Sequence, residues 1–167
     1  MTKKNRTINE LRQVKDSVYT MPVSNEPLHT IKDAQGENAS PILAPHVKNY
    51  LIDIDGTITE DVPNEEPERM GTCLPFVDAL ETCNRWFKEG HMICFFTSRT
   101  ETHRAVTEGW LKQHGFNYHS LLMGKPRGGN YHWIDNHLVK ATRYKGKFTD
   151  LVEKEVTIEV FDDGQND

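Results

Sequence analysis

The chain has 167 residues and a mass of 19.3 kDa, which suits a single domain with a hydrophobic core. It is 36% hydrophobic and 27% charged, and it contains neither an apolar run of membrane-spanning length nor the apolar core of a signal peptide. We therefore expect a cytoplasmic protein with no membrane partner. The formal net charge of −5 disfavours non-specific binding of nucleic acid, which we expect only as a possible substrate.

Residues 1–45 are predicted to form an extension ahead of the domain. Thr7-Ile8-Asn9-Glu10 has the pattern of a capping box, and apolar residues follow at helical spacing, which indicates a short amphipathic helix. Prolines in polar surroundings come next, as in a linker. The apolar stripe could dock on the domain or on a second subunit, so a homo-oligomer is one possible arrangement.

Residues 46–161 alternate between apolar strand patterns and helical patterns, and residues 162–167 form an acidic tail. The predicted strands are Tyr50 to Ile54, His91 to Phe96, Ser120 to Met123, Tyr131 to Ile134 and Val156 to Phe161. Helices are predicted from about Leu74 to Gly90, from about Glu101 to His114, and from Phe148 to Lys154. This alternation predicts an α/β fold with a doubly wound, mainly parallel, Rossmann-like sheet. The acidic loop at 61–71 is too short to hold a folded cap domain.

Polar residues stand at the ends of four predicted strands. Asp53 and Asp55 are two residues apart and would share one face of the first strand, while Thr97, Lys125 and Asp135 follow the next three. Ligands bind outside the carboxyl ends of parallel strands, so these side chains should converge on one crevice. An isolated pair of aspartates also occurs where a buried strand ends in a polar turn, but the later residues favour a chemical site.

These residue types suit chemistry on a phosphate group. One carboxylate can attack phosphorus to give an aspartyl-phosphate, and a second can protonate the leaving oxygen. A divalent cation can neutralise the charge between the carboxylates and the phosphate. A hydroxyl and an ammonium can hold the phosphoryl oxygens in the transition state.

The motif Asp53-Ile54-Asp55-Gly56-Thr57, followed in order by Thr97, Lys125 and Asp135, resembles the haloacid dehalogenase (HAD) superfamily of phosphatases. The short link between the lysine and the last acid is similar to that of small capsule-biosynthesis-type phosphatases, and polynucleotide phosphatases share the pattern. The resemblance implies that Asp53 is the nucleophile and Asp55 the general acid/base, with Thr97 and Lys125 holding the phosphate.

The resemblance also implies a Mg²⁺ ion held by Asp53, the backbone carbonyl of Asp55, and Asp135. Asn136 stands where these relatives tend to carry a second acid, and its amide oxygen could still contact the metal. Asp162-Asp163 is a rival for the last motif, because it also follows an apolar strand pattern. Residues expected around the substrate are Gly56, Thr57, Ser98, Arg99 and Arg127, with a structural role equally open for Arg99.

The leading hypothesis is a Mg²⁺-dependent phosphomonoesterase that forms an aspartyl-phosphate and acts on a small-molecule phosphate ester, a sugar phosphate or a nucleotide. A polynucleotide 3′-phosphatase is the alternative enzyme, although it would need a basic groove. A non-catalytic HAD-fold binding or scaffold protein is the alternative from another class.

Overall fold

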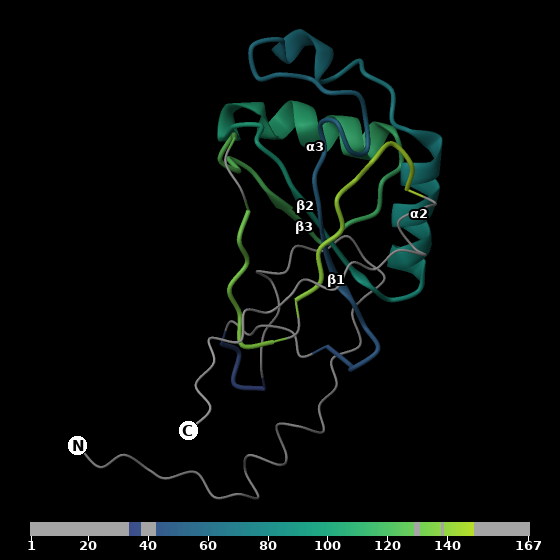
Figure 1. The fold of residues 1–167 in the computed structure, drawn as a ribbon, viewed down its shortest axis with the longest axis vertical. Helices are drawn as coiled ribbons and strands as arrows, with labels where there is room; N and C mark the ends of the chain where they lie inside the picture. The colour runs from purple at the N-terminus through teal and green to yellow at the C-terminus, as the bar shows by residue number, and fades with distance from the viewer. Residues whose placement is uncertain (1–33, 38–42, 129–130, 138, 149–167) are drawn as a thin grey trace, which may run out of the picture.

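The computed structural model describes residues 34–37, 43–128, 131–137 and 139–148. Its sheet has three parallel strands in the order β1-β2-β3, joined by two helical crossovers (Figure 1). The elements are β1 (Asn49–Ile52), α2 (Val77–Lys88), β2 (Met92–Phe96), α3 (Arg104–Gln113) and β3 (Ser120–Leu122). The predicted α/β class with a parallel sheet is confirmed.

Strand β2 lies at the centre of the sheet because its sequence is apolar on both faces. Four of its five residues are buried, as expected for a parallel strand covered on two sides. Strand β1 is more exposed and pairs with β2 from Asn49 opposite Met92 to Ile52 opposite Phe95. The ladder between β2 and β3 begins with Cys94 opposite Ser120.

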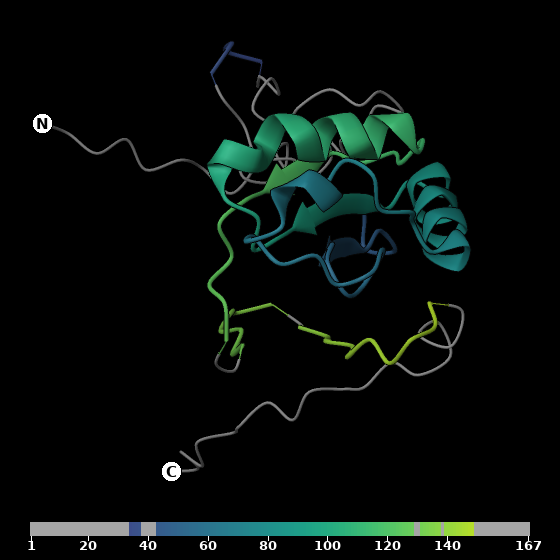
Figure 2. The same ribbon diagram turned by 90° about the horizontal axis from the view of Figure 1, so that it is seen from above.

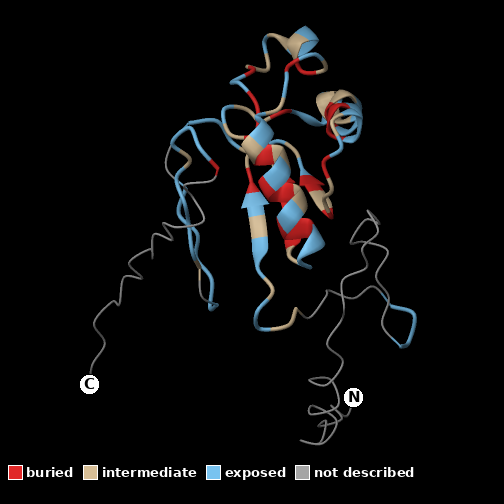
Figure 3. Ribbon diagram, turned by 90° about the vertical axis from the view of Figure 1, so that its right-hand side faces the viewer, coloured by how far each residue is buried: buried red, intermediate tan, exposed pale blue. Residues whose placement is uncertain are grey.

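Helix α2 packs its apolar face on the sheet and exposes the opposite face to solvent (Figure 3). The buried residues of this helix are Ala79, Thr82, Cys83, Trp86 and Phe87. It begins at Val77, later than the predicted start at Leu74, because Pro75 forms a bridge with Thr59 and the Phe76 N–H donates to Ile58. Gly90, with φ of +87°, follows the helix end in a conformation that favours glycine.

The connection between β1 and α2 is an ordered loop, and a cap domain is lacking in this fully described stretch. It contains the short 3₁₀ helix η2 (Pro67–Arg69) and buries Met70 completely. The Trp110 side chain of α3 donates a hydrogen bond of 2.7 Å to the Cys73 carbonyl at the end of this loop. The loop is therefore attached to helix α3, and its short length agrees with the predicted minimal cap.

The strand predicted at Tyr131–Ile134 is not formed. Residues 131–137 have no regular secondary structure and run apart from the three-stranded sheet (Figure 2). Tyr131, Trp133 and Ile134 are 65%, 54% and 87% exposed. Their polar contacts are local: the Tyr131 hydroxyl donates to the Pro126 carbonyl at 2.7 Å. An apolar segment becomes a strand only where a neighbouring strand supplies hydrogen-bond partners. Among the described residues this segment has no such neighbour, so the predicted strand is absent.

Residues 139–148 return to the helical layer. Phe148 is buried, its ring centroid lies 6.1 Å from that of Trp86, and its N–H donates to Asp78 at 2.7 Å. The helix predicted in the first 20 residues and the strand predicted at 156–161 lie outside the described residues, as does all but the first residue of the helix predicted from Phe148. The described part of the chain has no helix long and apolar enough to cross a membrane.

Candidate active site

Asp53 and Lys125 meet at the carboxyl ends of the outer strands β1 and β3. The Lys125 Nζ lies 2.6 Å from Asp53 Oδ1, which also accepts the Ile54 N–H at 3.0 Å. Lys125 is placed by the backbone, because its N–H donates to the Thr97 carbonyl at 2.9 Å beyond the end of β2. Asp53 retains 37% exposure of its side chain, so its carboxylate is open to a ligand from solvent.

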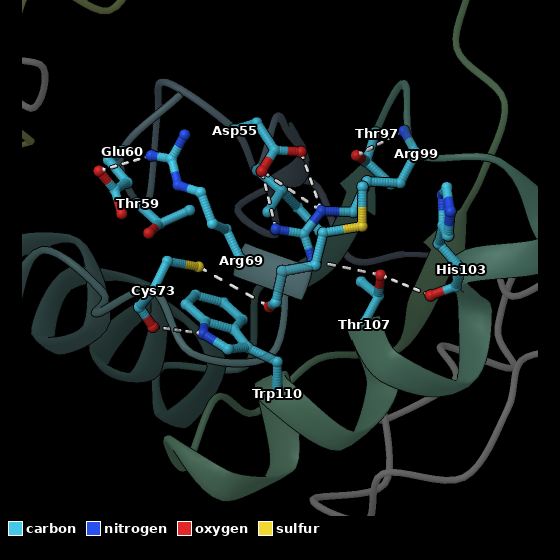
Figure 4. A network of polar contacts seen from close by, with 12 residues as sticks. Asp55, Thr59, Glu60, Arg69, Cys73, Thr97, Arg99, His103, Thr107 and Trp110 are labelled. Atoms are coloured by element: carbon cyan, nitrogen blue, oxygen red, sulfur yellow. Dashed lines mark hydrogen bonds and ion pairs between the residues drawn. The ribbon is translucent and has the colours of Figure 1, made fainter. Parts of the chain in front are cut away.

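Asp55 is held by Arg99 in a two-point ion pair (Figure 4). The Arg99 Nη2 lies 2.7 Å from Asp55 Oδ1, and the Arg99 Nε lies 2.9 Å from Asp55 Oδ2. The Arg99 side chain is completely buried, and the Asp55 side chain is only 8% exposed. Such planar pairing is the strong form of an arginine–carboxylate contact.

Burial and the Arg99 cation shift the pKa of the Asp55 carboxyl in opposite directions. Burial raises the pKa of its carboxyl, whereas the hydrogen bond and charge of Arg99 lower it; the nearby charges of Asp53 and Asp61 raise it further. The net result is a raised pKa. A carboxyl with this balance binds a proton more readily than an exposed aspartate and is still paired with a cation when it releases that proton.

Thr97 is completely buried at the end of β2. Its Oγ1 accepts the backbone N–H of Arg99 at 3.1 Å, and its own N–H donates to the Leu122 carbonyl at 2.9 Å. Since the oxygen already accepts a bond, the hydroxyl proton is available for donation to another acceptor. This arrangement suits a hydroxyl that binds a phosphate at the end of β2.

The remaining predicted substrate residues stand in the loops that follow the three strands. Gly56 follows Asp55 with φ of +74°. The Thr57 N–H donates to the Ile54 carbonyl and closes the turn. A side chain at Gly56 would meet Asp61 at 3.8 Å. Beyond the end of β2, the Ser98 carbonyl accepts a hydrogen bond of 2.9 Å from Asn64.

Arg127 lies further out, in the turn after Lys125. Its Nη1 is 2.7 Å from Glu65 Oε1, and both side chains are more than half exposed. This pair joins the turn to the acidic loop, and the contact between Asn64 and Ser98 lies beside it. Neither contact could be predicted from the sequence, because the partners are 62 and 34 residues apart along the chain.

Asp135 and Asn136 are exposed and belong to the segment that runs apart from the sheet. Asp135 accepts hydrogen bonds from the Trp133 side chain at 3.3 Å and from the His137 N–H at 3.1 Å, and these bonds hold the pKa of its carboxyl below its ordinary value. Within the described ranges, no group of three or more His, Cys, Asp or Glu side chains could hold a metal ion. Because Asp135 and Asn136 lie apart from the sheet, the described residues do not bring together the carboxylates of the predicted magnesium site.

An acidic hollow of about 570 Å³ opens beside Gly56, between the loop after β1 and the start of α2. Its charged lining residues are Glu60, Asp61, Asp78 and Glu81, and its aromatic ones are Phe76 and Tyr144. Acids so close to the crevice repel a substrate of high negative charge. The predicted acidic loop contributes one of these four acids, Asp61.

A family model described as "PITM 1-3, LNS2 domain" matches residues 50–154, well over half of the chain. The chain belongs to the LNS2 domain family. This family has a HAD-like phosphatase fold, so the predicted HAD-like superfamily is confirmed at that level. The match covers β1 from Tyr50 onward, strands β2 and β3, both helices and every residue of the candidate site. It does not distinguish the capsule-biosynthesis-type or polynucleotide-phosphatase-like subtype for this LNS2 domain.

No curated protein matches the chain. Among solved structures, a structural-genomics target from Vibrio cholerae is 24% identical, with a TM-score of 0.41 over 53% of this chain and 80% of that one. Two structures of the Pnkp1/Rnl/Hen1 RNA repair complex are 16% identical, with TM-scores of 0.40 and 0.42. These matches cover 61% and 70% of this chain but only 40% and 36% of those chains.

Proposed function

We propose that this LNS2 domain is a phosphomonoesterase that forms an aspartyl-phosphate on Asp53. The observation that supports the proposal most directly is the 2.6 Å contact between the Lys125 ammonium and the partly exposed Asp53 carboxylate. A cation beside the attacking oxygen favours binding of a phosphoryl group and offsets the charge that builds up during its transfer. The buried hydroxyl of Thr97 stands at the adjacent strand end.

The proposed reaction has two steps. In the first step an Asp53 oxygen forms a bond to phosphorus, the bond from phosphorus to the ester oxygen breaks, and protonated Asp55 gives its proton to that oxygen. In the second step water attacks phosphorus, the bond to Asp53 breaks, and Asp55 takes a proton from the water. The products are an alcohol and inorganic phosphate, and both aspartates return to their starting states.

We further propose a small substrate, a sugar phosphate or a nucleotide. Four acids line the hollow beside Gly56, and they disfavour a polyanion such as the end of a nucleic acid strand. A small monoester presents one phosphate to Lys125 and Thr97 and places little further negative charge near these acids. We also propose that the reaction requires Mg²⁺. This requirement is tested separately from the roles of Asp53, Lys125 and Thr97.

The deciding experiment compares the wild-type chain with Asp53→Asn in hydrolysis of 4-nitrophenyl phosphate, with Mg²⁺ supplied. We expect wild-type turnover and at least a roughly 10³-fold loss in the variant, because an amide cannot form the acyl-phosphate. Glu89→Gln is the matched control, since this exposed carboxylate lies at the opposite end of α2 from the site. Its activity should equal that of the wild type.

A panel of sugar phosphates, nucleotides and 3′-phosphorylated oligonucleotides then addresses the substrate. Preference for a small monoester supports the proposed class, and preference for the oligonucleotide contradicts it. Absence of wild-type activity toward every phosphate ester, or equal activity in Asp53→Asn, would contradict the phosphatase proposal itself. Those outcomes favour the non-catalytic binding protein.

A further inference from the structure

Arg99 has a different environment from the other cations at the crevice. Lys125 and Arg127 both reach solvent, whereas the Arg99 side chain has no exposed surface. It follows β2 and points toward Asp55 and toward Thr107 of helix α3 (Figure 4). The sequence predicted a substrate contact for Arg99 or, equally, a structural role.

The guanidinium is held on every side by described residues. Its Nε and Nη2 donate to Asp55, its Nη1 donates to Thr107 Oγ1 at 3.3 Å, and its carbon Cζ lies 5.9 Å from the centre of the Trp110 ring. Thr107 is itself fixed, because its hydroxyl donates to the His103 carbonyl at 2.8 Å. Movement of Arg99 toward a substrate would leave the buried Asp55 carboxylate without its cation, which is strongly unfavourable.

We propose that Arg99 is a positioning residue that fixes the orientation of the Asp55 carboxylate for proton transfer to the leaving oxygen. The inference rests on the proposed function, because it assigns a role within that reaction. It follows from the two-point contact: a planar fork that engages both carboxylate oxygens prevents rotation of the carboxylate, which a single-point contact would allow. Proton transfer depends on such alignment.

This arrangement also leaves part of Asp55 accessible to other groups. An ionised carboxylate has about four acceptor sites, and the Arg99 fork occupies only those on its own side. The charged groups near Asp55 are Arg99, Asp53 and Asp61. Because Asp53 is two residues away on the same strand end, the nucleophile and the fixed carboxylate can serve the same phosphate.

The test uses Arg99→Lys, which keeps the charge but removes the planar fork. General acid catalysis matters most for a poor leaving group, so we measure kcat and KM for 4-nitrophenyl phosphate and for an alkyl phosphate. We expect kcat for the alkyl phosphate to fall by about 10- to 100-fold, and kcat for the nitrophenyl ester by no more than about threefold, with KM little changed. Thr107→Val, which removes one acceptor of Arg99, should give the same pattern more weakly.

Asp55→Asn and the double variant Asp55→Asn/Arg99→Lys complete a cycle. If Arg99 acts through Asp55, the double variant loses no more alkyl-phosphate activity than Asp55→Asn alone. A raised KM with unchanged kcat would instead make Arg99 a substrate ligand, and equal losses for both esters would make its role merely structural. Either result overturns the inference, whereas loss of activity in Asp53→Asn tests the proposed function by itself.

A readout independent of activity is the urea midpoint of unfolding for the same four proteins. We expect the shifts of the two single variants not to add in the double variant, since both changes disrupt one ion pair. Additive shifts would show that Arg99 does not constrain Asp55, and the inference would then be wrong even for a chain without phosphatase activity.

Discussion

Lys125 shows how one side chain of the site is fixed by the residues around it. Its ammonium contacts Asp53 and lies 5.7 Å from the ring centre of Phe96 and 5.5 Å from that of Tyr131, so it is held between an anion and two aromatic faces. Only 11% of the side chain is exposed. The position of the positive charge is thus defined before a substrate binds, which lowers the cost of organising the site during reaction.

Removal of this charge should reduce catalysis more than stability. We expect Lys125→Met to lower kcat for 4-nitrophenyl phosphate by about 10²- to 10³-fold, the typical effect of losing one preorganised electrostatic contact. Asp53 is partly exposed and can be hydrated, so the fold should persist. Lys112→Met, at an exposed position of α3, is the control and should retain full activity. A loss below about threefold in Lys125→Met would argue against a role for this ammonium in the transition state.

Strand β2 and helix α2 could be predicted from the sequence, because the apolar patterns that indicate them are local. Continuous apolar residues identify β2, and the helical spacing of apolar residues identifies α2 within three residues of its start. The fork between Arg99 and Asp55 was not predictable, since it joins positions 44 residues apart and depends on how the two strand ends meet. The error at Tyr131–Ile134 has a similar cause, because a strand requires a distant partner as well as an apolar sequence.

The segment at 131–137 determines whether the proposed magnesium site can form. In the described sheet β1 pairs with β2 only, and Leu51 of β1 is 38% exposed. A doubly wound sheet would place a further strand beyond β1, and Tyr131–Ile134 in that position would bring Asp135 toward Asp53. Experiments on the metal requirement and on Asp135 therefore both test whether Asp135 lies near Asp53 in the active protein.

We expect hydrolysis of 4-nitrophenyl phosphate to cease in excess EDTA and to return when Mg²⁺ is restored. Asp135→Asn should require about 10- to 100-fold more Mg²⁺ for half-maximal activity, because an amide supplies no charge to the metal. The double variant Asp162→Asn/Asp163→Asn should behave as the wild type. The reverse pattern would assign the last motif to the acidic tail, and full activity in EDTA would refute the magnesium requirement.

At the scale of the whole molecule, two histidines stabilise the end of the sheet opposite to the site. Nδ1 of His119 accepts the Ile93 N–H at 3.1 Å, and Nδ1 of His91 accepts the Lys48 N–H at 3.2 Å. Both contacts require an unprotonated Nδ1. Burial lowers the pKa of both imidazoles below the ordinary value, and His119 is also stacked on Phe87 at 4.6 Å between ring centres.

These histidines should make stability fall as the pH drops below about 6.5, the ordinary pKa of histidine. In that range the unfolded chain binds protons that the folded chain excludes, so the free energy of unfolding decreases until the lowered folded-state pKa is passed. The urea midpoint should therefore be lower at pH 5.5 than at pH 7.5. His119→Gln retains an acceptor for Ile93 but does not titrate, so its midpoint should change less between the two pH values. An equal change of the midpoint in the wild type and in His119→Gln would contradict a contribution of His119 to the pH dependence.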